Sequence, residues 1–226
     1  ISRGVQPYSR GKHTEEQIKN RFLHASSQRS KQHLPELQGN ELSRYFIEPD
    51  RKSYLKYSDE IASTRPMRMF AGRRIVLRRL LTRKFRLQAS LATETMITTD
   101  NVLNMIPRAA ETSVEFALGI LNSKLISWMY VNTSMIAQKD DFPQVHISAL
   151  SGIRLPAADK SHHDKITALV QRMLVLHQQA RAATSDAARE RIQREIHVTD
   201  EQIDARVYEL YGLTKEEIKI VEESTR

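Results

Sequence analysis

The chain has 226 residues, no cysteine and a formal net charge of +8 at pH 7. The lack of cysteine excludes disulfides, thiolate metal sites and thiol chemistry, and no apolar run reaches the roughly 18 residues that a membrane-spanning helix needs. We therefore expect a cytoplasmic protein without a membrane partner.

The charge is unevenly distributed along the chain. Residues 186–226 contain 11 acidic and 7 basic side chains, a net charge of −4, which leaves +12 for the first 185 residues. A basic body followed by an acidic end is typical of a nucleic-acid-binding body joined to a part with another task.

The first third of the chain predicts a loop, a short helix and then strands. Residues 1–33 are polar, with a flexible stretch from Gly4 to Lys12 and a helix from Thr14 to Ala25 that begins with a capping box. A turn at Gly39 leads into a strand that ends at Ile47. Further strands are expected at 54–57, 74–80, 87–95 and 97–105, with the second and third of these paired as a hairpin.

The most basic stretch runs from Arg65 to Arg86 and contains no acid. Alternation along a strand puts Ile75 and Leu77 on one face, and Arg74 and Arg78 on the other. A row of guanidinium groups repels itself unless an anion faces it. The stretch therefore predicts a DNA-facing strand, with a solvated edge that opposes aggregation as the alternative.

Helical spacing begins near residue 112 and predicts a helix to about Tyr130, with Trp128 in the core. After the body closes at Pro156, a helix capped by Ser161 is expected, then a turn at 182–186 and a second helix that ends at Gly212. Thr214 then caps a short terminal helix. The pattern predicts an α+β fold, in which a curved mixed β-sheet body with packed helices (residues 1–158) is followed by an antiparallel helical hairpin and a short terminal helix (residues 159–226).

Catalytic motifs are missing from the sequence. It has neither a glycine-rich S-adenosylmethionine loop nor an Asn-Pro-Pro-aromatic motif, and Pro49-Asp50 matches only the first half of a PD…(D/E)xK nuclease pattern. We therefore predict no catalytic residue and no metal site in this chain.

The remaining chemistry is that of binding. Lysine and arginine neutralise phosphates, arginine reads guanine, and asparagine or glutamine reads adenine. Asn40, Gln88 and Gln138 are candidate base readers. The predicted DNA-binding residues are Tyr8, Lys12, Arg44, Arg73, Arg74, Arg78, Arg79, Arg83, Lys84 and Lys139.

The order of five motifs resembles the TaqI-like C-terminal specificity domain of adenine-specific DNA methyltransferases and type IIG restriction-modification enzymes. They are Gly4-Val5-x-x-Tyr8-x-x-Gly11-Lys12; Leu37-x-Gly39-x-x-Leu42-x-Arg44-Tyr45 with Lys56-Tyr57; Phe70 with Ile75-Val76-Leu77-Arg78; Ala117-Leu118-Gly119-Ile120-Leu121-Asn122-Ser123-Lys124-Leu125 with Lys139, Phe142-Pro143 and Leu155-Pro156; and Ile203-Asp204-x-x-Val207-Tyr208-Glu209-Leu210-Tyr211-Gly212-Leu213-Thr214-x-Glu216-Glu217-Ile218. Ala157-Ala158 departs from the usual second Ile-Pro, and Arg73-Arg74 replaces a frequent Pro-Lys.

The resemblance implies sequence-specific recognition of duplex DNA by a fragment of a restriction-modification enzyme. Residues 1–158 would be the target-recognition body, and residues 159–226 would brace it. A methyltransferase domain upstream in the same polypeptide would bind S-adenosylmethionine and modify adenine, with or without a fused endonuclease. No cofactor is expected in this fragment.

Three other functions remain open from the residues alone. The first is a DNA endonuclease in its own right, and the second is an RNA-binding or assembly module. The third is a scaffold that dimerises through its helical hairpin. The lack of aromatic RNA-binding strand motifs and of a GXXG loop counts against the RNA-binding alternative.

Overall fold

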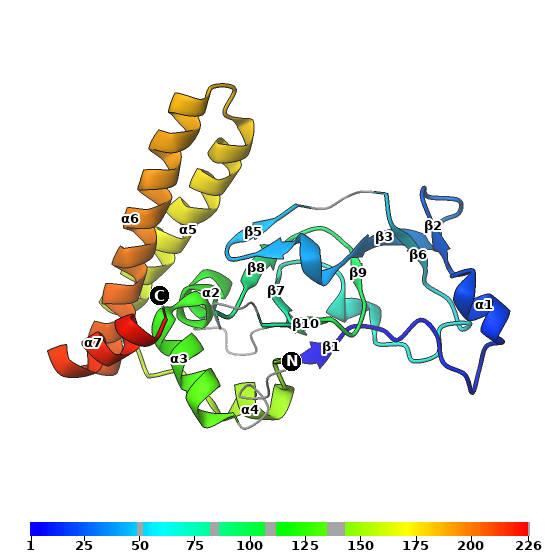
Figure 1. Ribbon diagram of the computed structural model, residues 1–226, viewed down its shortest axis with the longest axis horizontal. Helices are drawn as coiled ribbons and strands as arrows, with labels where there is room; N and C mark the ends of the chain where they lie inside the picture. The colour runs from blue at the N-terminus through cyan, green and yellow to red at the C-terminus, as the bar shows by residue number, and fades with distance from the viewer. Residues whose placement is uncertain (49–51, 82–85, 107–111, 135–142, 226) are drawn as a thin grey trace.

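A computed structural model of the chain describes residues 1–48, 52–81, 86–106, 112–134 and 143–225. Two four-stranded sheets form the body, and a long helical hairpin projects away from them (Figure 1). The predicted α+β class, with a mixed-sheet body followed by helices, is confirmed. Among the described helices, none has both the length and the apolar character needed to cross a membrane.

The first sheet is antiparallel throughout and contains the basic strand. Its order is β1 (Ser2–Arg3), β10 (Val102–Met105), β7 (Arg74–Arg78) and β8 (Ala89–Ala92). The predicted hairpin of β7 with β8 is confirmed by the register, in which Leu77 pairs with Ala89. Strand β7 therefore has a neighbour on each edge.

The second sheet is mixed. Its order is β2 (His24–Ala25), β6 (Tyr54–Lys56), β3 (His33–Leu37) and β9 (Ile97–Thr98), and only the pairing of β3 with β9 is parallel. Strands β1, β2 and β3 lie within or next to the stretch expected to be a loop. Strands β1 and β2 have only two residues each, β2 lies at the end of the stretch expected to be a helix, and the proline in β3 hid its strand pattern.

Short elements position the loops around the sheets. Helix α1 (Glu15–Lys19) begins with the predicted capping box of Thr14 and Gln17. It ends well before the expected Ala25, because Arg21 has a left-handed φ of 48° that an α-helix cannot contain. The 3₁₀ turns η1 (Gly39–Glu41) and η2 (Met67–Met69) precede the hairpin of β4 (Leu42–Ser43) with β5 (Phe46–Ile47) and strand β7, respectively.

The helix expected at 112–130 is two helices, α2 (Val114–Asn122) and α3 (Lys124–Thr133). Ser123 separates them with an extended backbone, and its hydroxyl accepts a hydrogen bond from the Ile126 amide at 3.3 Å. Serine is a favoured N-cap residue, so it starts a new helix here instead of continuing the old one. Helix α4 (Ile147–Gly152) follows.

The helical region consists of α5 (Lys160–Ala182), α6 (Asp186–Tyr211) and α7 (Lys215–Ser224). Asp159, not the expected Ser161, caps α5. Gly212, with φ 67°, ends α6 as predicted, and Thr214 with Glu217 forms the predicted capping box of α7. Helices α5 and α6 pack along each other as the expected hairpin (Figure 1).

One hydrophobic core joins the body to the helical region. It contains Ile75 and Leu77 of β7 together with Ile166, Val170, Ile203 and Val207 of the hairpin, and Trp128 packs against it from a partly buried position. Helix α2 lies between the two parts, contacting β7 and β8 as well as α5. The division of the chain near residue 158 stays a prediction, and residues on both sides of it contribute to this core.

Candidate nucleic-acid interface

A cleft of about 450 Å³ opens among the strands of the two sheets. One wall comes from β3 and η1, and the other comes from the end of β7 and the turn between β9 and β10. The N-terminal loop, Arg21 and His24 of β2 complete the lining. The lining residues are Pro7, Tyr8, Arg21, His24, Glu36, Gln38, Gly39, Asn40, Arg78, Leu80, Thr99 and Asn101.

Arg78 is the predicted arginine that the structure brings into this cleft. It is the last residue of β7, where the buried strand becomes partly exposed. One Nη1–H donates to the side-chain oxygen of Gln88 at 3.4 Å. The rest of its guanidinium fork has no protein acceptor among the described residues, which suits a planar acceptor pair such as a guanine edge.

Arg74 corrects the expected placement of the basic strand. Both faces of β7 are covered at this position, and Arg74 is completely buried. Its guanidinium donates to the carbonyl oxygens of Gly72, Glu94 and Met96 at 2.9–3.1 Å and to Asn104 Oδ1 at 3.4 Å. Burial lowers the pKa of Arg74 to about 10. The expectation that this guanidinium faces solvent beside Arg78 is wrong, and Arg74 does not line the cleft.

Arg44 is likewise engaged inside the protein. Its two terminal nitrogens donate to both carboxylate oxygens of Asp200 on α6, with Nη1 to Oδ2 at 2.7 Å. Only 22% of its side chain is exposed. Arg44 therefore links the body to the helical hairpin and does not line the cleft.

Arg73 and Arg79 lie outside the cleft as well, each beside an acid. Arg73 pairs with Glu115 of α2 while half of its side chain stays exposed. Arg79 Nη1 lies 3.5 Å from Asp100 Oδ2, and its side chain is mostly buried. These partners neutralise much of the charge that the sequence assigned to DNA.

Two residues of the N-terminal loop have structural contacts. Lys12 donates to the carbonyl oxygens of Asp59 and Ile61, the latter at 2.8 Å, and so ties the loop to the segment after β6. Tyr8 lines the cleft with its ring, while its hydroxyl accepts from the Leu23 amide at 3.0 Å and lies 2.8 Å from His24 Nδ1. The other predicted contacts, Arg83, Lys84 and Lys139, lie outside the described residues, as do Gln138 and Asp50.

Arg21 and Asn101 are cleft residues that the sequence patterns missed. Arg21 is exposed at the rim, and among the described residues its guanidinium has no hydrogen bond or ion pair. Asn101 is also exposed, and its carbonyl accepts from the Arg79 amide at 2.9 Å, which fixes the turn before β10. The Asn20-Arg21 step after a short helix was a weak signal of a left-handed helix end.

One acid, Glu36, lies at the bottom of the cleft. It is 4% exposed, accepts from Ser53 Oγ at 2.5 Å and lies 3.5 Å from His24 Nε2. Burial pushes the pKa of Glu36 upward, but the adjacent His24 ring and the hydrogen bond from Ser53 outweigh this and hold the pKa below its usual range. The carboxylate is thus paired inside the wall, and the cleft residues in the exposed class, Arg21, Asn40 and Asn101, carry guanidinium and amide groups.

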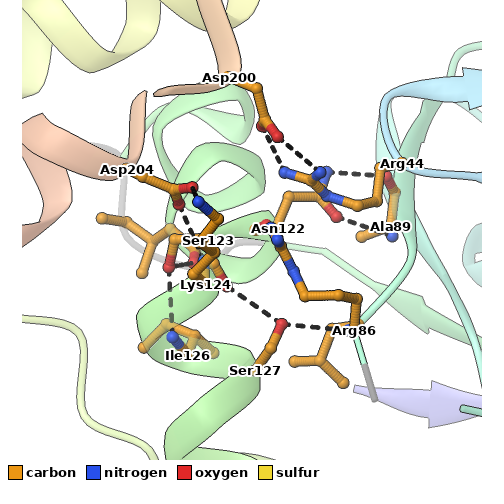
Figure 2. A network of polar contacts seen from close by, with 12 residues as sticks. Arg44, Arg86, Ala89, Asn122, Ser123, Lys124, Ile126, Ser127, Asp200 and Asp204 are labelled. Carbon is orange, nitrogen blue, oxygen red and sulfur yellow. Dashed lines mark hydrogen bonds and ion pairs between the residues drawn. The ribbon is translucent and has the colours of Figure 1, made fainter. Parts of the chain in front are cut away.

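The junction between body and helical region has a second polar cluster (Figure 2). Arg44 meets Asp200, the Lys124 amide donates to Asp204 Oδ1 at 2.8 Å, and Arg86 donates to the carbonyl oxygen of Asn122 at 2.9 Å. The described residues contain no group of three or more acidic or histidine side chains arranged to hold a metal ion. The contacts of this cluster join the body to the helical region, and the cleft is the candidate site.

Residues 34–156, just over half of the chain, match the family model of the TaqI-like C-terminal specificity domain. The chain belongs to this family. Eight of the twelve cleft residues, from Glu36 to Asn101, lie within the matched segment. The resemblance found in the sequence motifs is thus confirmed.

Individual relatives agree with the family. The chain is 29% identical over 156 residues to a putative type II restriction enzyme and methyltransferase from Methanocaldococcus jannaschii, a match that covers 68% of the chain and 13% of that protein. The solved structure of the type IIL restriction-modification enzyme MmeI in complex with DNA superposes with a TM-score of 0.64 at 12% identity. It covers 99% of the chain and 34% of MmeI, and at this identity the likeness concerns the fold.

Proposed function

We propose that the chain is the sequence-specific duplex-DNA recognition domain of a restriction-modification enzyme. The parent would be an adenine-specific DNA methyltransferase, with or without a fused endonuclease. Its recognition domain reads base edges, and its catalytic domain carries out the chemistry. Membership of the specificity-domain family supports the proposal.

The chemistry of the cleft carries the proposal. Arg78, Asn40 and Asn101 supply the side-chain types that make paired hydrogen bonds with guanine and adenine in the major groove. Asn40 and Asn101 are exposed on opposite walls, one on η1 and the other before β10. Arginines and amides that converge in this way match a base-reading site better than a catalytic one.

Arg21 has a different role in this proposal. Its exposed guanidinium has no partner within the part of the chain that the structure describes, so it is free to meet a phosphate at the cleft. Phosphate contacts hold a protein in register on the duplex, and base contacts then select the sequence. We assign Arg21 to the phosphates, and Arg78, Asn40 and Asn101 to the bases.

The rest of the parent enzyme would supply what this chain lacks. A methyltransferase domain in the same polypeptide would bind S-adenosylmethionine and take the target adenine out of the stack, as enzymes that act on bases do. The recognition domain would hold the duplex against it. We place the assembled enzyme in the cytoplasm, where it meets DNA.

A binding titration tests the proposal. Fluorescence anisotropy of a labelled duplex is measured for the wild-type chain, for Arg78→Glu and for Arg191→Glu. Arg191 is exposed on α6, away from the cleft, so its reversal makes the same change in net charge elsewhere. We expect Arg78→Glu to weaken binding at least about tenfold, since it removes an attraction and adds a repulsion.

Salt dependence and sequence preference complete the test. Wild-type binding should weaken steeply with added salt, and a duplex pool with a randomised centre should yield a preferred sequence. Equal loss of affinity in Arg78→Glu and Arg191→Glu would contradict the cleft as the site. The absence of any preferred sequence would contradict recognition itself.

A further inference from the structure

The segment from Gln38 to Ile47 joins the cleft directly to the helical hairpin. At its start, Gln38, Gly39 and Asn40 line the cleft. At its end, Arg44 contacts α6 and Phe46 contacts α5. Only a few residues separate the two contacts, so a displacement of one end of the segment is transmitted to the other end.

The segment is stiffened along its whole length. The Gln38 amide donates to Glu41 Oε2 at 2.5 Å, and the Glu41 amide donates back to the Gln38 carbonyl at 3.1 Å. The Glu48 amide then closes on the Glu41 carbonyl at 3.0 Å, beside the pairing of Leu42 with Ile47. The 3₁₀ turn and the β4–β5 hairpin therefore behave as one hydrogen-bonded unit.

The cleft end of this unit is in close contact with the opposite wall. A Cβ atom built on Gly39 would lie 3.4 Å from the carbonyl oxygen of Asn101 and 3.8 Å from Cγ of Arg78. These are van der Waals distances, so η1 lies against both of these cleft residues. Movement of η1 thus changes the spacing between Asn40 and the groups that face it.

The hairpin end has three consecutive contacts. Arg44 forms the two-pronged ion pair with Asp200, and the Phe46 ring stacks on His177 with centroids 5.7 Å apart and planes at 17°. Between them, Tyr45 is 3% exposed and packs in the shared core. Tyr45 has a left-handed φ of 63°, a conformation that is unfavourable for residues other than glycine. The contacts around Tyr45 must therefore hold this turn in place.

We infer that Arg44 is a positioning residue for DNA recognition, because its pairing with Asp200 lets the helical hairpin fix the place of Asn40 in the cleft. The inference rests on the proposed function. It replaces the direct DNA contact expected for Arg44 with an indirect one. Base readers need tightly held geometry, whereas phosphate contacts carry no sequence information, so the pair should govern discrimination more than total affinity.

Neutralising Asp200 tests the inference, because electrostatics and positioning predict changes of opposite sign in the affinity for the preferred duplex. Asp200→Asn makes the chain more basic, so electrostatics alone predicts tighter binding to any duplex. Positioning predicts the opposite for the preferred sequence. Glu195→Gln is the matched control, because it makes the same charge change on α6 in an exposed pair with Arg172 that does not involve the body.

The measurement is a ratio of two dissociation constants. A duplex selected by the wild-type chain from a pool randomised in its centre is compared with a scrambled duplex of equal length. We expect this discrimination to fall about tenfold in Asp200→Asn and in Arg44→Ala, with no further loss in the double variant, since paired residues are not additive. Glu195→Gln should retain the wild-type ratio.

Hydrogen exchange without DNA gives a second, independent readout. Amides of Gly39–Glu41 should exchange faster in Asp200→Asn than in the wild type or Glu195→Gln. Unchanged exchange there, or wild-type discrimination in Asp200→Asn, would overturn the inference, as would an Arg44→Ala effect that adds fully to that of Asp200→Asn. If the wild-type chain shows no sequence preference, the proposed function fails, and the exchange result alone then decides whether the hairpin positions η1.

Discussion

Asn122, the last residue of α2, and Ala89, on the outer edge of β8, exchange two hydrogen bonds of 2.9 Å each (Figure 2). The side-chain amide donates to the Ala89 carbonyl and accepts from the Ala89 amide, as the backbone of a further strand would. Asn122 is completely buried. It therefore supplies the acceptor for the Ala89 amide at this strand edge, where the Ala89 carbonyl also accepts from the Tyr45 amide at 2.8 Å, and this explains the asparagine in the Leu-Asn-Ser-Lys-Leu motif.

Replacing Asn122 with alanine should destabilise the fold by about 2–3 kcal/mol, because the buried Ala89 amide loses its acceptor and a small void opens. Urea unfolding of the wild type and the variant checks this value. Asn132→Ala is the control, since Asn132 is exposed on α3 and its side chain bonds to the Trp128 carbonyl one turn before it. A similar loss of stability in both variants would mean that the two hydrogen bonds with Ala89 contribute no more than an exposed side-chain hydrogen bond.

Gly119 lets α2 pack closely on the hairpin. A Cβ atom at this position would lie 2.8 Å from Cγ2 of Val170 and 2.9 Å from Cγ2 of Ile166, both buried. We expect Gly119→Ala to lower the free energy of unfolding by about 1–3 kcal/mol through overpacking. Gly152→Ala should be neutral or stabilising by up to about 1 kcal/mol, because its Cβ would meet nothing within 4 Å. Thermal or urea unfolding that ranks the two variants in the reverse order would refute this packing.

Replacing Arg21 with glycine should have opposite effects on the stability of the fold and on DNA binding. Arg21→Gly relieves the left-handed φ of 48° and should raise the free energy of unfolding by about 0.5–1 kcal/mol. The same change removes a phosphate contact, so the slope of log affinity against log salt should fall by about one. Lys19→Gly also removes one cation, but from the end of α1, and should lose stability without that change in slope. An unchanged salt slope in Arg21→Gly would place Arg21 outside the interface.

Asp204 makes stability depend on pH in the mildly acidic range. Burial raises its pKa from the ordinary 3.8 to about 6, even though the Lys124 amide and nearby Arg86 favour the charged form. The folded chain therefore binds this proton more tightly than the unfolded chain. The stability that Asp204 contributes is complete below pH 4 and is lost as pH rises toward 6, by up to about 3 kcal/mol.

The Asp204→Asn variant isolates this contribution. Its free energy of unfolding, minus that of the wild type, should rise between pH 4 and pH 7 in urea titrations. Asp164→Asn alters an exposed acid that pairs with Lys160 on α5, and it should show no such rise. Parallel pH profiles for the wild type and Asp204→Asn would contradict the raised pKa.

Features that neighbouring residues determine could be predicted, whereas features that depend on distant contacts could not. The capping boxes at Thr14 and Thr214, the left-handed end at Gly212 and the pairing of β7 with β8 follow from neighbouring residues, and they were predicted correctly. The break at Ser123 was missed because the apolar spacing continues through it. A capping serine inside a helical pattern ends one helix and starts another only when Asp204 and the sheet hold both helices in place.

The candidate site was harder to predict because burial is decided by distant segments. Alternation correctly separates Arg74 from Ile75 along β7, but it does not tell whether a second layer covers the outer face. Arg44 was assigned to DNA because Asp200, its partner, is 156 positions away in the chain. In the composition such a charge looks free to bind DNA, whereas in the folded chain it is already paired with an acid.

The core that joins β7, α2 and the hairpin has a practical consequence for altering specificity. In a chimera that exchanges residues 1–158 between relatives, the new α2 must fit Ile166, Val170 and Ile203 of the old hairpin, and the closeness at Gly119 leaves little tolerance for a mismatch. A transplanted recognition region should therefore carry its own hairpin. Asn40 and Asn101 are exposed outside this core, so they are suited to exchange one side chain at a time.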